Sequence, residues 1–237
     1  RLEAETYLRD LIEAEPDPSR NPELLLKLAT ITSDAEEGQL LLERVINSAR
    51  DSDPLPAARR LRADYLRASR HYVSAAREYE TAARHLSGAA ATDASLRRAD
   101  CLLAADDASA AEAAYRAVLR RDGLSKAAET AGELGVAASF LQRGQPNVAA
   151  EHFTRVAEKY EDRGTRLRAL AGAAEGYQAA GVAGKALRAL SELVEMYPDS
   201  FEAVLARSRI PLLEQLEAAA TDTLGEPTDT QDAPDSE

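Results

Sequence analysis

Residues 174–198 of this chain have the sequence AEGYQAAGVAGKALRALSELVEMYP. Ala186, Leu190 and Leu193 are spaced four and three residues apart in it, so they share one face of a helix. Gly181 separates this helix from an earlier apolar segment, at the point where a hairpin needs a turn. The stretch therefore predicts two helices joined by a short turn.

The same kind of triplet recurs upstream, and successive triplets are 36, 38 and 37 residues apart. We call the four triplets the ladder: Ala75, Tyr79 and Ala82; Ala111, Tyr115 and Val118; Ala149, Phe153 and Val156; Ala186, Leu190 and Leu193. A first helix precedes each triplet, with a small and a large residue three positions apart: Ala63 and Leu66, Ala99 and Leu102, Ala137 and Phe140, Ala174 and Tyr177. A fixed period in this range is typical of stacked helical repeats.

Composition supports helices throughout. The chain is rich in Ala, Leu, Arg and Glu, which favour helix, and no long run of Val, Ile and Thr indicates a sheet. We therefore predict an all-α fold, a right-handed α-solenoid of antiparallel helical hairpins. It would have about five to six units and a C-terminal capping helix.

The pattern resembles the tetratricopeptide repeat. The positions of this family are matched here by Ala174, Tyr177, Gly181, Ala186, Leu190, Leu193 and Pro198. Leu190 stands where an aromatic residue is usual, and the other three clear units carry Ser87, Gly123 and Glu161 in place of the terminal Pro. The resemblance implies a stack of hairpins whose first helices line a concave groove.

We expect the array to extend to both ends of the chain. The expected boundaries are residues 1–16 (second helix of a truncated repeat), 17–56 (degenerate repeat), 57–91, 92–129, 130–166 and 167–198 (four repeats), 199–220 (capping helix) and 221–237 (disordered acidic tail).

Several signals mark the ends of these elements. Ala4, Leu8, Leu11 and Pro16 match a second helix, which implies that the array continues before Arg1. Helix starts are expected at Asn21 followed by Pro22, at a capping box over residues 33–36, at Asp53 followed by Pro54, and at Pro146. Pro211 is expected to kink the capping helix or end it early.

No constellation indicates catalysis, a cofactor or a metal site, and we expect no enzyme. Residues 181–186, GVAGKA, differ from a phosphate loop because the glycine spacing is short and Ala186 replaces Ser or Thr. His71, His85 and His152 lack a second ligand at metal-binding spacing. Cys101, the single cysteine, is expected to be buried and inert.

The functional surface is then expected on the first helices. The family register places nine polar residues in the groove: Arg60, Asp64, Arg67, Arg97, Asp100, Gln142, Arg168, Glu175 and Gln178. Their guanidinium groups suit carboxylates or backbone carbonyls. The alternative is a set of ordinary surface ion pairs, such as Arg60 with Asp64. The family's carboxylate-clamp positions hold Asp64, Asp100, Ala138 and Glu175 without an Asn, which argues against capture of a chaperone's C-terminal carboxylate.

The sequence favours a scaffold that binds a protein or peptide in this groove. The alternative is a structural or oligomerisation segment of a larger protein, with self-association. Half of the net charge of −12 lies in residues 221–237, and no basic patch indicates nucleic acid. No stretch is apolar enough to span a membrane. Residues 195–200, EMYPDS, resemble the repeat junction of bacterial envelope lipoproteins and of coordinators of cell-wall synthesis, so periplasm or cell envelope and cytoplasm both stay open.

Overall fold

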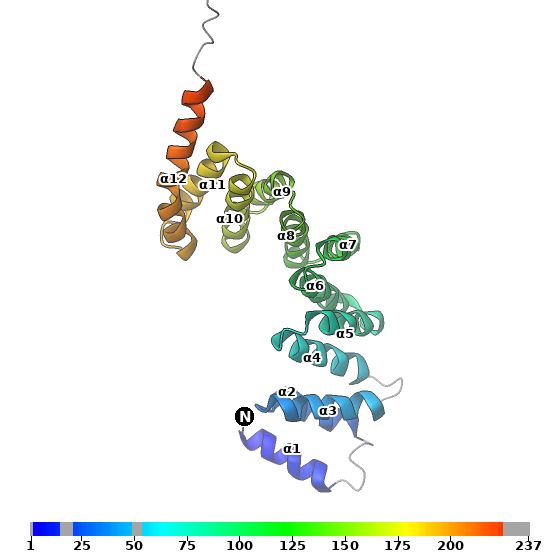
Figure 1. The fold of residues 1–237 in the computed structure, drawn as a ribbon. Coiled ribbons are helices and arrows are strands. Elements are labelled where there is room, and N and C mark those ends of the chain that lie inside the picture. The colour runs from blue at the N-terminus through cyan, green and yellow to red at the C-terminus, as the bar shows by residue number, and fades with distance from the viewer. Residues whose placement is uncertain (1, 15–20, 49–53, 225–237) are drawn as a thin grey trace, which may run out of the picture. The chain divides into compact units, whose positions relative to one another are not determined.

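The computed structural model describes residues 2–14, 21–48 and 54–224, with side chains up to residue 219 (Figure 1). The described residues form twelve helices and no strand. The helices are α1 (Leu2–Ala14), α2 (Pro22–Ile31), α3 (Ala35–Ser48), α4 (Pro54–Ala68), α5 (Tyr72–His85), α6 (Gly88–Ala104), α7 (Ala108–Leu119), α8 (Lys126–Gln142), α9 (Pro146–Lys159), α10 (Arg163–Ala179), α11 (Ala183–Met196) and α12 (Phe201–Leu224). The signals at Pro16 and Asp53 lie outside the described residues.

The chain divides into two compact units, unit 1 (Arg1–Gly144) and unit 2 (Gln145–Glu237). In unit 1 each helix from α1 to α8 packs against the next along the chain, and in unit 2 the helices α9 to α12 do the same. In unit 1, α2 also contacts α4 and α6 contacts α8. Contacts restricted to near neighbours in sequence define a solenoid, so the predicted all-α solenoid is confirmed.

The ladder residues contribute to the core of each unit. All twelve of its residues are buried, and the most accessible of them, Phe153, exposes 7% of its surface. The small residues of the first helices, Ala63, Ala99, Ala137 and Ala174, have no exposed surface. Small side chains at these points let two helix backbones approach closely, while the larger ladder residues fill the space beside them. The sequence thus identified the core correctly.

Two glycines complete this packing, and the sequence analysis did not single them out. A Cβ on Gly135 would lie 2.4 Å from the Tyr115 ring, and a Cβ on Gly172 would lie 2.8 Å from the Phe153 ring. Gly135 and Gly172 are 37 residues apart, one repeat. The rings of Tyr115 and Phe153 therefore each lie against the bare backbone of the first helix that follows.

The turn inside each clear hairpin contains one residue with positive φ. These residues are Arg70 (62°), Asp106 (66°), Gly144 (71°) and Gly181 (75°). They follow the repeat period, and the turn predicted at Gly181 is confirmed. A left-handed backbone at Arg70 and Asp106 is costly for residues with a Cβ, so the same turn is strained in the two earlier hairpins.

Two helix starts were predicted in the degenerate repeat. The capping residue is as predicted for α2 and differs from the prediction for α3. Asn21 caps α2 by accepting a hydrogen bond from the Leu24 amide, as predicted. In α3 the capping side chain is that of Asp34 rather than Ser33, because its Oδ1 accepts from the amides of residues 36 and 37 at 2.9 and 3.3 Å. The predicted capping box is therefore wrong in its capping residue.

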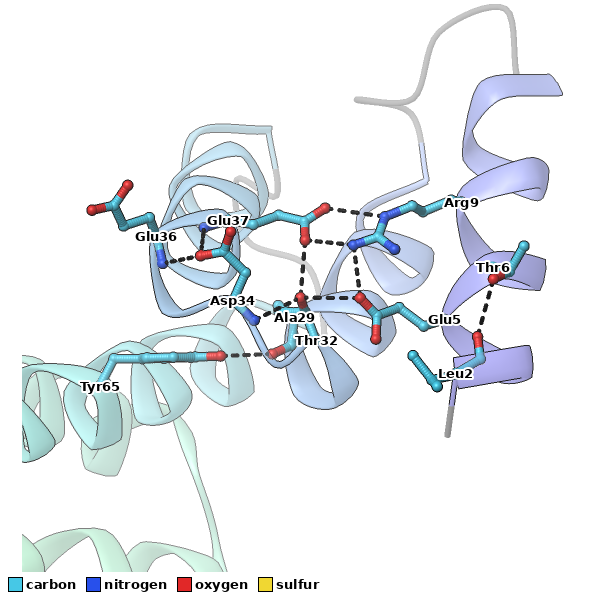
Figure 2. Close-up of polar contacts among 10 residues, drawn as sticks. All are labelled: Leu2, Glu5, Thr6, Arg9, Ala29, Thr32, Asp34, Glu36, Glu37 and Tyr65. Carbon is cyan, nitrogen blue, oxygen red and sulfur yellow. Dashed lines mark hydrogen bonds and ion pairs between the residues drawn. The ribbon is translucent and has the colours of Figure 1, made fainter.

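A cluster of polar side chains links α1 to the α2–α3 hairpin, and Figure 2 shows these side chains pointing toward one another. Arg9 Nη2 lies 2.7 Å from Glu5 Oε1 and 2.6 Å from Glu37 Oε2. Thr32 Oγ1 donates to Glu37 Oε2 at 2.9 Å. Nearby, Tyr65 of α4 donates to the Ala29 carbonyl at 3.1 Å. These contacts join helices from both sides of α2 and α3.

Helix α12 continues through Pro211, so the expectation that this proline ends it early is wrong. Ala206 and Leu213 on either side of Pro211 are buried, and α12 packs against α11. Packing on both sides of Pro211 stabilises the helix. Proline has no backbone N–H, so one helical carbonyl loses its donor, and the exposed position of Pro211 lets water donate to that carbonyl instead. The helix runs to Leu224, so it includes the first four residues of the predicted tail.

Candidate partner-binding surface on the first helices

Four polar contacts link α4, α5 and α6 in unit 1, and we call them the polar chain. Arg60 Nη1 lies 3.5 Å from Asp93 Oδ2, and Arg97 Nε donates to the same oxygen at 2.9 Å. Arg97 Nη1 also donates to Asp64 Oδ1 at 3.3 Å, and this oxygen accepts the Tyr79 hydroxyl at 2.5 Å. The expected pair of Arg60 with Asp64 is replaced by contacts between the first helices of neighbouring hairpins.

Electrostatics in the polar chain follow from its partial burial. Burial lowers the pKa of Arg97, but the hydrogen bond to Asp93 and the charges of Asp93 and Asp64 raise this pKa by more. Burial and then the hydrogen bond to Asp64 raise the pKa of Tyr79 above its ordinary value. The arginine therefore stays charged and the tyrosine stays a hydrogen-bond donor.

Two more predicted residues lie at the C-terminal end of the same helices. Asp100 is exposed and accepts the Tyr115 hydroxyl at 2.5 Å. Arg67 is exposed on α4, and its charge acts on Tyr79 and on Cys101. Cys101 exposes 1% of its surface, and burial raises its pKa to about 11, so the predicted burial of this thiol is confirmed.

An open hollow of about 740 Å³ lies between the N-terminal halves of α6 and α8. Its walls are largely small and apolar, with Ala91, Leu96, Ala127, Ala128 and Ala131 among the lining residues. Arg121 also lines it and donates to Ser95 Oγ at 2.9 Å. Polar residues line it as well, among them Thr92, Asp93 and Asp122, so this concave surface can hold small apolar side chains of a partner beside polar groups.

Asp93 belongs to both features, because it lines the hollow and bonds to Arg60 and Arg97. Asp93, Arg97 and Asp100 stand at positions i, i+4 and i+7 of α6, on one face of the helix. Seven residues of helix span about 10 Å, the length of roughly three residues of an extended peptide. The hollow and the polar chain therefore form one continuous surface along α6.

Of the other four predicted residues, one lies in unit 1 and three lie in unit 2. In unit 1, Gln142 Nε2 donates to the Leu103 carbonyl at 3.1 Å and to Asp106 Oδ1 at 2.7 Å. In unit 2, Gln178 accepts from Arg209 of α12, so its side chain is already engaged. Arg168 and Glu175 are exposed on α10.

Sequence reasoning missed Asp93 and the hollow. Asp93 precedes Arg97 by four residues, a spacing that signals a side-chain pair on a helix. The hollow left no such signal, because it depends on how the loop before α8 passes the start of α6.

Two further findings concern the described residues as a whole. None of their helices has both the length and the low polarity that crossing a bilayer requires. Within the same described ranges, no three His, Cys, Asp or Glu side chains gather closely enough to hold a metal ion.

Comparison with known proteins gives similarity in structure only. No protein-family model and no curated protein matches the sequence. Among solved structures, YrrB, described as a TPR protein with an unusual peptide-binding site, superposes with a TM-score of 0.60 at 16% identity, over 85% of this chain and 97% of that one. BtubC (BKLC) from P. vanneervenii superposes with a TM-score of 0.59 at 15% identity, over 98% of this chain and 93% of that one. The chain therefore has the fold of tetratricopeptide repeat proteins.

Proposed function

We propose that this chain is a non-enzymatic scaffold that binds a peptide or protein partner along the first helices of unit 1. The observation that carries the proposal is the position of Asp93, which joins an apolar hollow to a chain of paired charges. YrrB, which shares the fold, is described as having a peptide-binding site, and this supports a peptide as the class of ligand.

The surface suggests the chemistry of the partner. The hollow accepts small apolar side chains, because Ala and Leu make up half of its lining residues. Arg67 is exposed near the C-terminal end of α4. Its guanidinium group can bind a carboxylate or a backbone carbonyl of the partner. We infer a short extended segment that carries an apolar side chain and, at another position, an acidic group.

Selection from a random-peptide display library on the purified protein tests this proposal. Affinities of the enriched peptides would then be measured by fluorescence anisotropy for two site variants. Arg67→Glu reverses an exposed charge, and Ala127→Trp fills the hollow from an exposed position. We expect each variant to bind about tenfold more weakly or worse, the loss of one good charged or apolar contact.

The matched controls carry the same changes on second helices. Arg77→Glu on α5 and Ala113→Trp on α7 alter exposed residues outside the hollow and the polar chain. Both should bind like the wild type. Equal affinity of site and control variants, or no enriched peptide at all, would reject the proposed surface.

A further inference from the structure

Exposed apolar side chains gather on α12, the last helix of unit 2. Five of the large hydrophobic side chains that are exposed among the described residues belong to this helix: Phe201, Val204, Leu205, Leu212 and Leu216. They expose between 49% and 71% of their surface. The last helix of a solenoid ordinarily presents a polar outer face, so α12 departs from that rule.

Helix α12 is apolar on two opposite sides. Its inner side, with Ala203, Ala206 and Leu213, is buried where α12 packs against α11. Its outer side carries residues spaced four, three, four and four apart, so they share one stripe of the helix. We call them the outer stripe: Phe201, Leu205, Ser208, Leu212 and Leu216. A helix with apolar residues on opposite sides is ordinarily covered on both, which makes the outer stripe a candidate contact with another helix.

The outer stripe is symmetric about its own centre. Leu205 and Leu212 lie at equal distances from the midpoint between residues 208 and 209, and so do Phe201 and Leu216. A two-fold axis through this midpoint would place Leu205 opposite Leu212 of a second copy and Phe201 opposite Leu216. The small Ser208 lies at the centre, where it allows two helix backbones to approach closely. Such self-complementarity is what a contact between identical surfaces requires.

We propose that α12 packs antiparallel against α12 of a second copy through the outer stripe, which gives a two-fold symmetric dimer. The paired segment, residues 201–216, is about 24 Å long. The outer stripe contains no charged residue, so closing the contact buries no charge within it. Residues 225–237 contain no Leu, Ile, Val, Met or aromatic residue that could occupy the outer stripe instead.

The charges beside the outer stripe fit the antiparallel arrangement. The charged residues of the paired segment would lie opposite uncharged ones of the second copy: Glu202 opposite Gln215, Arg207 opposite Ile210, Arg209 opposite Ser208, and Glu214 opposite Ala203. The two Arg209 residues come near each other at the axis, but each guanidinium donates to Gln178 of its own α10 and so lies to the side of the outer stripe. In a parallel pair each of the four charges would lie beside its own copy, which is unfavourable.

Sedimentation velocity of the whole chain at concentrations from about 10 μM to about 1 mM tests the proposal. We expect the wild type to form dimers, and nothing larger, as the concentration rises. Leu205→Glu with Leu212→Glu places four like charges in the contact and should leave the protein monomeric. Leu40→Glu with Val73→Glu, at exposed sites of α3 and α5, should dimerise like the wild type. A monomeric wild type, larger species, or equal effects of the two double variants would overturn the proposal.

A third double variant tests the direction of the helices. Leu205→Glu with Leu212→Lys places Glu opposite Lys twice in the antiparallel pair, whereas a parallel pair would bring Glu to Glu and Lys to Lys. We therefore expect this variant to dimerise at least about tenfold more tightly than Leu205→Glu with Leu212→Glu. Equal dissociation constants of the two variants would overturn the antiparallel contact. All substituted residues are exposed, and circular dichroism confirms that the helices of each variant are intact.

Disulfide formation locates the centre of the contact. Ser208→Cys places two thiols beside the two-fold axis, so mild oxidation should link two copies covalently. Ala219→Cys, exposed on the same helix, is the matched control, because its two copies would lie about 30 Å apart along the axis and should not be linked. The native Cys101 is buried and should not take part. Linkage through residue 219 as readily as through residue 208, or no linkage through residue 208, would overturn the proposal. Because the contact lies in unit 2, its failure leaves the proposed partner surface of unit 1 unaffected.

Discussion

Tyr79 donates a hydrogen bond of 2.5 Å to Asp64, fifteen residues earlier, and Tyr115 makes the same bond to Asp100. Each bond links the ladder residue of a second helix to the first helix of the same hairpin. The equivalent positions of the next repeat hold Phe153 and Ala138. Phe153 has no hydroxyl, and Ala138 has no carboxylate. This is the pattern expected if the aspartates are present to accept hydrogen bonds from buried tyrosine hydroxyls.

We expect the Tyr115–Asp100 bond to stabilise the fold measurably. Asp100→Ala leaves the buried Tyr115 hydroxyl without its acceptor and should cost about 2 kcal/mol. Tyr115→Phe should cost about 1 kcal/mol, and the double variant should cost less than Asp100→Ala alone, because it leaves no buried hydroxyl without an acceptor. Urea unfolding of the four proteins measures the coupling. Strictly additive effects would show that the bond contributes nothing.

These pairs also show what the sequence revealed and what it did not. Periodicity identified the ladder and its burial, because apolar residues at helical spacing have one way to leave water. The partners of Tyr79 and Tyr115 were not identified, although Asp64 and Asp100 were singled out as groove residues. A fixed separation of fifteen residues is meaningful only when the hairpin geometry is known, so it could not be found from helix periodicity.

The sequence predicted most residues of the polar chain but not which of them pair with each other. Arg60, Asp64 and Arg97 were expected on one surface, but the contacts run from α4 to α6 rather than along α4. Pairing within a helix follows from spacing, whereas pairing between helices depends on their relative rotation. For the same reason the hollow beside Asp93 was not predicted.

Gly172 should be intolerant of a methyl group although it lies inside a helix. At an unobstructed helical site Gly→Ala stabilises by up to about 1 kcal/mol. At Gly172 the new Cβ would meet the Phe153 ring at 2.8 Å, so we expect Gly172→Ala to destabilise by about 1–3 kcal/mol. Gly164→Ala in the same helix is the control, because its nearest neighbour atom is 3.9 Å away. Thermal unfolding compares them, and equal effects would contradict the close packing.

Replacing Arg70, which has a left-handed backbone conformation, with Gly should stabilise the fold. Its φ of 62° is strained for a residue with a Cβ, so Arg70→Gly should raise the free energy of unfolding by about 0.5–1 kcal/mol. Gly181→Ala, at the equivalent position with φ of 75°, should lower it by about 1 kcal/mol. Urea titrations measure both. Opposite signs are required, because the same backbone conformation gains from Gly and loses from Ala.

The cluster that fastens α1 should weaken in acid. The hydrogen bond from Arg9, followed by that from Thr32, lowers the pKa of Glu37 below its ordinary value. A carboxyl with a lowered folded pKa stabilises the fold above its unfolded pKa, and this contribution is lost as the pH falls through the folded value. Glu37→Gln should therefore destabilise at pH 7 and have a smaller effect near pH 3. A difference between the two proteins that is the same at both pH values would contradict this role.

Cys101 should report on opening of the hairpins around it. Burial raises the pKa of its thiol to about 11, so at pH 8 only about one molecule in a thousand carries a thiolate. With 1% of its surface exposed, the thiol should react with an aromatic disulfide reagent only when the surrounding helices open. We expect labelling in native buffer to be at least about a hundredfold slower than in urea. Arg70→Gly, by stabilising the adjoining hairpin, should slow it further, whereas rapid labelling of the native protein would show that this part of the core is accessible.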